Sequence, residues 1–249
     1  LEKQTMLLES SLFYLLIPIV AFLYASVGHG GASGYLALMA LFSFPPPMMK
    51  QTALLLNLFV AGGAFYHYYR AGHFNKNLFI YFAIGSIPAA YLGGMGTLDL
   101  WIYKKILGFI LFFAVARMLF THTSEKRITQ QISVIPALLM GIVIGYFSGL
   151  IGIGGGIILT PLILLLQWGN MKEAAAVSAL FIWVNSASGL IGQFSSGVAL
   201  SSATFILVAL ALAGGLLGSY FGSRSWNNRK LEYFLALVLT TAGIKLILF

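Results

Sequence analysis

The most constraining feature of this sequence is a succession of apolar runs, each about as long as a helix that crosses a bilayer. Leu12 to Val27 forms one such run, and Trp101 to Phe120 forms another. Charged residues make up only 8% of the 249 residues and hydrophobic residues 59%, against about 25% charged residues in a soluble domain. Because a run of about 20 apolar residues spans a hydrocarbon layer of roughly 30 Å, we predict an integral membrane protein that crosses the bilayer several times.

Ten apolar segments can be distinguished, and all are predicted to be helices because lipid-exposed backbone must satisfy its own hydrogen bonds. The segments cover Ser11–Val27, Gly31–Phe44, Met48–Tyr69, Asn77–Met95, Trp101–Phe120, Ile132–Ile151, Gly156–Trp168, Lys172–Phe194, Ser201–Phe221 and Arg229–Phe249. The second and seventh are short, so each either spans the bilayer or forms a re-entrant hairpin with the helix before it. The predicted fold class is therefore all-α integral membrane, with ten transmembrane or partly re-entrant helical segments.

The two halves of the chain repeat each other. The cluster Gly28-His29-Gly30-Gly31-Ala32 matches Gly152-Ile153-Gly154-Gly155-Gly156, and Thr52-Ala53-Leu54 matches Ser178-Ala179-Leu180. This order predicts two five-helix repeats, 1–125 and 126–249, joined by the polar loop around Ser124. An odd number of spans in each repeat forces the second copy to sit upside down, which gives inverted-topology repeats.

The net charge of +8 does not indicate a nucleic-acid partner, because Lys and Arg flank the apolar runs, where they serve as topology anchors. Counting these basic residues loop by loop favours both termini outside the cytoplasm, by the positive-inside rule. The chain has no cysteine, which excludes disulfides and thiolate metal sites. We predict no metal site and no cofactor.

The paired glycine clusters are the best candidates for a binding site. Each ends one helix and opens a short one, and a helix N-terminus combines unpaired N–H donors with a partial positive charge. Two such sites can hold an anion without a cationic side chain, near the midplane where transporters bind their substrates. The alternative is that the glycines only let helices pack closely. The candidate residues are Gly28, Gly30, Gly31, Gly152, Gly154, Gly155 and Gly156.

A few polar side chains in the apolar segments extend this candidate site. Thr52, Asn57, Ser178 and Asn185 can each donate a hydrogen bond to an oxyanion, although they could equally hold helices together. His29 could bind an anion as imidazolium, carry a proton coupled to transport, or be a packed neutral histidine. All six acidic residues lie in tails, in loops or at helix ends, so an anionic or neutral substrate fits better than a cation.

A competing interpretation comes from Gly31-Ala32-Ser33-Gly34, a GxSG string like the nucleophile motif of rhomboid intramembrane proteases. That chemistry needs a histidine base near the serine, and His67 is the candidate. The string is short and the chain is rich in glycine, so we rank a protease below a transporter.

The stretches GHGGASG, KQTALLLNL, GIGGGIILTPLILL and AAAVSAL resemble the TauE/SafE family of bacterial membrane proteins, also described as the sulfite exporter or four-toluene-sulfonate-uptake permease family. The resemblance runs from about Phe13 to Phe249. It implies a multi-pass secondary transporter of the bacterial inner membrane, with small sulfur-containing anions such as sulfite or organosulfonates as substrates. His29 opposite Ile153 and Ala32 opposite Gly156 depart from strict symmetry, so the half-sites are expected to contribute unequally.

These observations predict alternating access around a central anion site, with protons as a candidate coupling ion. A passive anion channel would share the same fold and remains an alternative. The sequence leaves open which anion is carried, whether it is exported or imported, and the oligomeric state.

Overall fold

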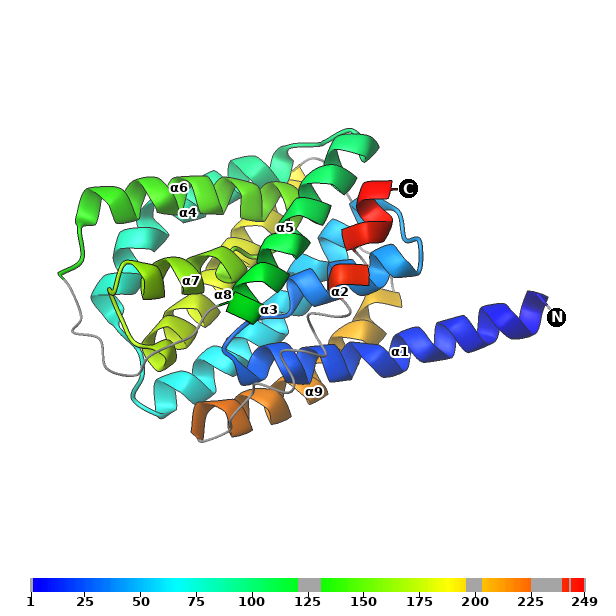
Figure 1. The fold of residues 1–249 in the computed structure, drawn as a ribbon, viewed down its shortest axis with the longest axis horizontal. Coiled ribbons are helices and arrows are strands. Elements are labelled where there is room, and N and C mark those ends of the chain that lie inside the picture. Colours follow the sequence, from blue (N-terminus) through cyan, green and yellow to red (C-terminus); the bar gives the residue numbers. More distant parts are fainter. Residues whose placement is uncertain (1, 121–130, 196–202, 225–238, 242, 249) are drawn as a thin grey trace.

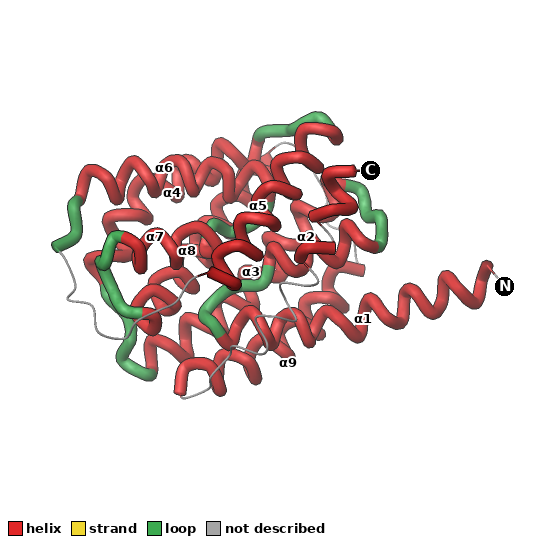
Figure 2. Tube along the Cα trace, in the orientation of Figure 1, coloured by secondary structure: helices red, strands yellow, loops and turns green. Residues whose placement is uncertain are grey.

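The computed structural model of the protein describes residues 2–120, 131–195, 203–224, 239–241 and 243–248 (Figures 1 and 2). The helices are α1 (Glu2–Ser26), α2 (Ala32–Leu41), α3 (Pro46–Arg70), α4 (Lys76–Met95), α5 (Leu100–Phe120), α6 (Val134–Ile151), α7 (Gly156–Leu165), α8 (Met171–Ser195) and α9 (Ala203–Arg224). Residues 239–241 and 243–248 are helical as well. The prediction of an all-helical fold is confirmed for this part of the chain, in which no residue forms a strand.

Five of these helices are long and apolar enough to cross a membrane, namely α3, α4, α6, α8 and the Thr204–Arg224 part of α9. Large apolar side chains are exposed on the outer faces of the helices, with Ile135 at 72% and Trp101 at 69% of their full exposure. A monomeric soluble protein rarely exposes so much contiguous apolar surface, whereas in a bilayer such side chains face lipid. The chain is therefore a multi-pass membrane protein, as its sequence predicts.

The predicted segments differ from the helices mainly at their ends. α1 begins at Glu2 rather than Ser11, because Glu2 to Ser10 contain no proline or glycine that would stop a helix. α7 ends at Leu165 rather than Trp168, because Gln167 adopts a left-handed backbone with φ of 56°. The repeat junction around Ser124 lies outside the described residues, and so does the start of the segment predicted over Arg229–Phe249.

The two short helices are the returning limbs of hairpins. α2 and α7 have 10 residues each, which at 1.5 Å per residue is about 15 Å, or half of a bilayer core. At the end of α2, Phe44 stacks on Phe13 of α1 with ring centroids 5.0 Å apart. Figure 1 shows α2 running back toward the N-terminal end of α1 and α7 running back toward the start of α6, at opposite ends of the molecule. The sequence left this point open.

α3 and α8 pack against each other, and the other long helices pack around them. α4 contacts both α6 and α8, while α9 contacts both α1 and α3. Exchanging each helix for the one five places away in the other half, α4 for α9, α6 for α1 and α8 for α3, turns the first set of contacts into the second. The packing of the two halves therefore corresponds helix by helix.

Glycine faces bring the helix backbones together at these contacts. A Cβ added to Gly145 of α6 would lie 2.3 Å from the carbonyl oxygen of Ser86 on α4, and one added to Gly218 of α9 would lie 2.0 Å from that of Phe22 on α1. The same close approach recurs one turn to either side, at Gly141 and Gly149 and at Gly214 and Gly222. Such small-residue faces are typical of membrane helix packing, so for these glycines packing alone is a sufficient explanation.

Candidate functional site

Two glycine loops connect the limbs of the hairpins, residues 27–31 between α1 and α2 and residues 152–155 between α6 and α7. Gly28 and Gly31 have φ of 78° and 93°, and their counterparts Gly152 and Gly155 have φ of 94° and 81°. A residue with a Cβ adopts this left-handed backbone only at a cost. The glycines of both clusters are therefore needed for the chain to reverse, and Gly31 and Gly155 become the N-cap residues of α2 and α7.

The two loops meet at the same pair of side chains, Asn57 of α3 and Ile182 of α8. A Cβ added to Gly30 would lie 2.5 Å from Asn57 Oδ1 and 2.9 Å from Ile182 Cγ2. A Cβ added to Gly154 would lie 2.5 Å from Asn57 Nδ2 and 2.8 Å from Ile182 Cγ2. Loops that are far apart in the sequence thus converge at the centre of the molecule. Counted from the first residues of α3 and α8, Pro46 and Met171, Asn57 and Ile182 occupy the same position in their helices.

Five consecutive backbone amides at each glycine loop have no acceptor among the described residues. They are the N–H groups of Gly30 to Gly34 and of Ile153 to Ile157. The next amides along the chain are those of Tyr35, which donates to Gly31 O at 2.9 Å, and Ile158, which donates to Gly155 O at 3.1 Å. Neither N-cap supplies a side-chain cap. Two buried helix N-termini therefore present free donors and partial positive charge.

A chain of side-chain hydrogen bonds links the first glycine loop to the second half of the protein. His29 is 3% exposed, and its Nδ1 lies 3.0 Å from the carbonyl oxygen of Val27. Its Nε2 lies 3.2 Å from Thr160 Oγ1, which lies 2.8 Å from Ser178 Oγ. A carbonyl only accepts, so Nδ1 carries the proton, and in the neutral ring Nε2 accepts from Thr160. The sequence analysis did not single out Thr160, which lies in the middle of an apolar run.

Several buried polar atoms have no hydrogen-bond partner within the described chain. Two of them lie against the glycine loops, namely Asn57 Oδ1 and the Tyr35 hydroxyl. Thr52 Oγ1, a predicted site atom, is also without a partner in the described chain, but no described contact joins it to the loops. Tyr35 is fully buried, and its hydroxyl would lie 2.7 Å from a Cβ added to Gly31. Native proteins pair nearly all buried polar groups, so this set of side chains is suited to a polar ligand. Tyr35 is a further residue that the sequence analysis missed.

Not all predicted site residues come together. Five of them lie together at the centre, namely His29, Gly30, Asn57, Gly154 and Gly156. Gly30 and Gly154 both lie against Asn57, and a Cβ on Gly156 would lie 3.7 Å from His29 Cδ2.

The remaining glycines contact other groups. Gly28 packs against Ala175 of α8 and Gly152 against Lys50 of α3, so both let helices approach closely. Gly155 lies against Ile144 and Phe181, and Gly31 against Tyr35. No described contact joins Asn185 to the loops, because its Nδ2 donates to Phe181 O at 2.8 Å while its Oδ1 has no partner.

Lys50 is the charged side chain that is buried among the described residues, and none of the buried side chains there is acidic. Its ammonium donates to Gly94 O and Gly96 O at 3.0 Å each. These carbonyls lie at the C-terminal end of α4, where the helix dipole favours a cation. The sequence analysis counted Lys50 among loop anchors, whereas its ammonium holds the end of α4.

The serine and histidine that a protease would need have other partners. Ser33 Oγ donates to the Tyr24 hydroxyl at 2.8 Å. His67 Nδ1 lies 2.8 Å from Ser219 Oγ on α9. A nucleophile and its base must be within hydrogen-bond reach of each other, and the hydrogen bonds of these two residues run to different helices.

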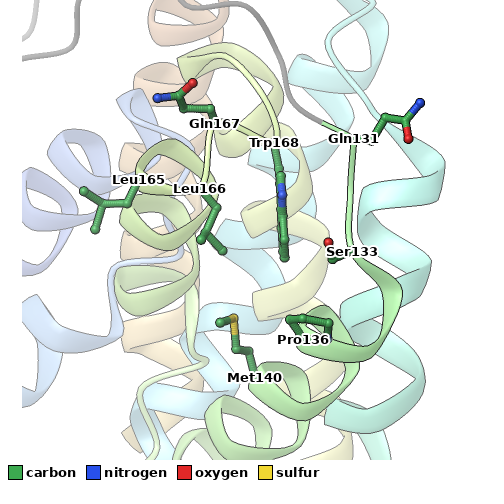
Figure 3. Close-up of a pocket in the computed structure, with 8 residues that line it drawn as sticks. All are labelled: Gln131, Ser133, Pro136, Met140, Leu165, Leu166, Gln167 and Trp168. Carbon is green, nitrogen blue, oxygen red and sulfur yellow. The ribbon is translucent and has the colours of Figure 1, made fainter.

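An open pocket of about 340 Å³ lies away from the glycine loops. It is lined by Gln131, Ser133, Pro136, Met140, Leu165, Leu166, Gln167 and Trp168 (Figure 3). These residues come from the start of α6 and the end of α7. None of them belongs to the predicted site.

Comparison with known proteins gives a consistent result. The profile of the family described as "Sulfite exporter TauE/SafE" matches residues 13–246. The "Probable membrane transporter protein y4hK" of Sinorhizobium fredii is 37% identical over 234 residues, which cover 92% of this chain and 94% of that protein. The "Probable membrane transporter protein YjnA" of Bacillus subtilis is 27% identical over 241 residues, covering 88% and 92%. No solved structure matches the chain.

Proposed function

The chain belongs to the sulfite exporter TauE/SafE family, and from that premise we propose that it is a secondary transporter that carries a small sulfur-containing anion across the bacterial inner membrane by alternating access. Relatives named as membrane transporters support the general activity. The observation that carries the specific proposal is the convergence of the two glycine loops on Asn57 and Ile182, where the amides of Gly30 to Gly34 and of Ile153 to Ile157 have no acceptor among the described residues.

The proposed substrate is an anion because the centre offers mostly donors. Helix N-termini with free N–H groups bind oxyanions without further cations. The hydroxyls of Tyr35 and Thr52 can donate as well, since neither has a partner in the described chain. Lys50 bonds to the end of α4, so we assign it no role in binding the substrate.

The proposed architecture is a pair of inverted repeats that move against each other. The backbone of residues 28–44 supports this proposal because its left-handed positions recur in the second half: Ser43 with φ of 59° follows α2 as Gln167 with φ of 56° follows α7. Residues 28–31 and 152–155 of the glycine loops are all buried, so a substrate can reach them only if helices separate. Rocking of one repeat against the other would expose the centre to each side in turn.

Protons are the proposed coupling ion, and His29 is the proposed carrier. When the ring takes up a second proton, Nε2 becomes a donor to Thr160 Oγ1, so the Thr160 hydroxyl must turn and donate elsewhere. The chain from His29 through Thr160 to Ser178 would then reverse its polarity. Protonation in the first glycine loop would in this way be transmitted to α7 and α8 of the other half.

The proposal is tested by two alanine substitutions in the glycine loops and one matched control. Gly30→Ala adds a methyl group against Asn57 and Ile182 on ordinary backbone, and Gly154→Ala adds one at the same place with φ of 73°. Gly72→Ala is the control, because Gly72 has φ of 78° but nothing within 4 Å of its added Cβ. Uptake of radiolabelled sulfite into proteoliposomes is the measurement, with protein folding checked by thermal unfolding.

We expect Gly72→Ala to transport like the parent, and Gly30→Ala and Gly154→Ala to lose most of the transport while remaining folded. Saturation with sulfite concentration and a response to an imposed proton gradient would distinguish this carrier from a passive channel. Transport at the parental rate by Gly30→Ala would show that the glycine loops do not hold the substrate.

A further inference from the structure

The pocket at the start of α6 is amphipathic. Figure 3 shows Trp168 standing between Leu166 and Ser133, with Pro136 and Met140 beyond it and the amides of Gln131 and Gln167 pointing outward. The polar residues lie where α6 begins and α7 has ended, at the end of the hairpin that faces away from the glycine loops (Figure 1). The pocket thus has polar residues at one end and apolar residues at the other, and the buried ring of Trp168 forms one of its walls.

A layer of closely packed side chains separates the pocket from the second glycine loop. The ring centroids of Trp168, which lines the pocket, and Phe82 are 6.0 Å apart, and those of Phe82 and Phe181 are 6.5 Å apart. Phe181 and Ile144 in turn would each be 2.8 Å from a Cβ added to Gly155. Ile144 lies one helical turn beyond Met140, which lines the pocket. The pocket and the second glycine loop therefore lie on opposite sides of one apolar layer.

The matching end of the first hairpin is filled. Phe42 and Phe44, which follow α2 as Leu166 and Trp168 follow α7, both pack on Phe13 of α1, with ring centroids 5.2 and 5.0 Å apart. Phe13 is 3% exposed. Counted from the glycine loops, the residue of α6 that corresponds to Phe13 is Ala137. The first half thus carries an aromatic plug at the level where the second half has a pocket.

We propose that this pocket is the vestibule through which the transported anion reaches the glycine loops from one side of the membrane, and that the Ile144, Phe82, Phe181 and Trp168 layer is the gate that closes it. The inference rests on the proposed transport function. The Phe13, Phe42 and Phe44 cluster is the corresponding closed route from the other side. The described part of the structure is therefore closed at the centre, and the vestibule lies at the end of the second hairpin.

The lining of the pocket suits a hydrated anion. The residues that line it include no acidic side chain, so no fixed negative charge repels the substrate. Neutral hydrogen-bond donors are supplied by Gln131, Ser133 and Gln167. Ser133 is also the N-cap residue of α6, and its side chain makes no capping hydrogen bond to that helix. The first amides of α6 therefore face the mouth of the pocket with the positive end of the helix dipole.

The first test uses the absence of cysteine from the chain. Met140→Cys places one thiol in the pocket, and Leu16→Cys places one at the matching position of α1, in the half that is plugged. A membrane-impermeant maleimide added to proteoliposomes should react with Cys at position 140 and leave position 16 unmodified. Ser133→Trp, which fills the mouth, should slow the reaction at position 140 several-fold, whereas Ile135→Trp on the neighbouring lipid-facing side should not.

The second test measures radiolabelled sulfite uptake by the same tryptophan variants without the cysteines. The vestibule predicts that Ser133→Trp, and independently Gln131→Trp, lose most of the transport, while Ile135→Trp keeps it. If the parent and both pocket variants transport equally well, the vestibule is wrong and the transport function stands. If the parent moves no sulfite and no organosulfonate, the transport function fails and the vestibule fails with it. Equal labelling of positions 16 and 140 would also overturn the vestibule.

Discussion

At the scale of single residues, Asn57 is the side chain on which the account depends. Both glycine loops contact it, its Nδ2 lies 3.3 Å from Ser186 Oγ, and its Oδ1 has no described partner. Its counterpart Ile182 is aliphatic, as Ile153 is opposite His29. The histidine and the amide side chain that lies against both loops therefore come from the first half, and we expect substitutions at His29 and Asn57 to affect binding more than substitutions at Ile153 and Ile182.

Asn57→Asp should abolish binding of sulfite, because it keeps the size of the side chain and adds a negative charge where the anion is held. Burial without a counter-ion makes that charge strongly repulsive. The measurement is the increase in melting temperature that sulfite gives to the purified protein, since a ligand of the folded state stabilises it. Asn75→Asp is the control, because Asn75 caps α4 through its side-chain oxygen, which Asp retains. A parental sulfite response in Asn57→Asp would remove Asn57 from the site.

Thr160→Val should flatten the dependence of transport on pH without abolishing sulfite binding. Valine has nearly the shape of threonine but cannot connect His29 Nε2 with Ser178 Oγ. Transport rates measured across the range in which histidine titrates give the readout. Thr204→Val, in a buried position of α9, controls for the loss of a hydroxyl elsewhere. An unchanged pH profile in Thr160→Val would exclude the hydrogen-bond chain from proton coupling.

At the scale of helices, the sequence predicted more of the fold than of the site. Apolar runs locate the helices because the bilayer forces backbone to pair internally, and the repeated glycines locate both loops. Contacts between distant segments leave no such pattern. Thr160 lies in an apolar run, and only the fold brings it to His29. Tyr35 lies one helical turn after Gly31, but its apolar surroundings give no sign in the sequence that its hydroxyl would be buried without a partner in the described chain. Gly28 and Gly152 share the motif of the site glycines but pack against α8 and α3.

Gly145→Ala should destabilise the protein, because the added methyl group would lie 2.3 Å from a backbone oxygen of α4 that cannot move without its helix. Overpacking of this kind costs about 1–3 kcal/mol and should lower the melting temperature. Gly63→Ala is the matched control, since the nearest atom to its Cβ is the end of the flexible Leu216 side chain, at 2.8 Å. Equal melting temperatures for the two variants would show that the α4–α6 contact is loose.

At the scale of the whole molecule, the two hairpins enter from opposite ends and place one glycine loop each at the centre (Figure 1). Both described chain ends lie at the same end of the molecule in this view. Chemical differences between the halves, such as Phe13 against Ala137, make the two routes to the centre unequal. A carrier built in this way can rest with one route partly formed.

The distribution of basic residues favours both termini outside the cytoplasm, and we propose this orientation. Alkaline phosphatase fused after Phe249 should therefore be active in bacterial cells, and green fluorescent protein fused at the same position should be dark. Bright fluorescence with an inactive phosphatase would show that the termini lie in the cytoplasm, and would place the vestibule on the opposite side of the membrane. Fusions after Gly72, in the turn between α3 and α4, provide the internal reference, with the opposite result expected.

We propose that the two converging glycine loops hold an oxyanion, and crystals grown with selenite would show where that anion binds. Selenite has the shape and charge of sulfite, and its selenium gives an anomalous signal that marks its position. The account predicts a peak between Gly30 and Gly154, within hydrogen-bond distance of the loop amides and next to Asn57. An anomalous peak elsewhere in the protein, with none at the amides of the two glycine loops, would contradict it.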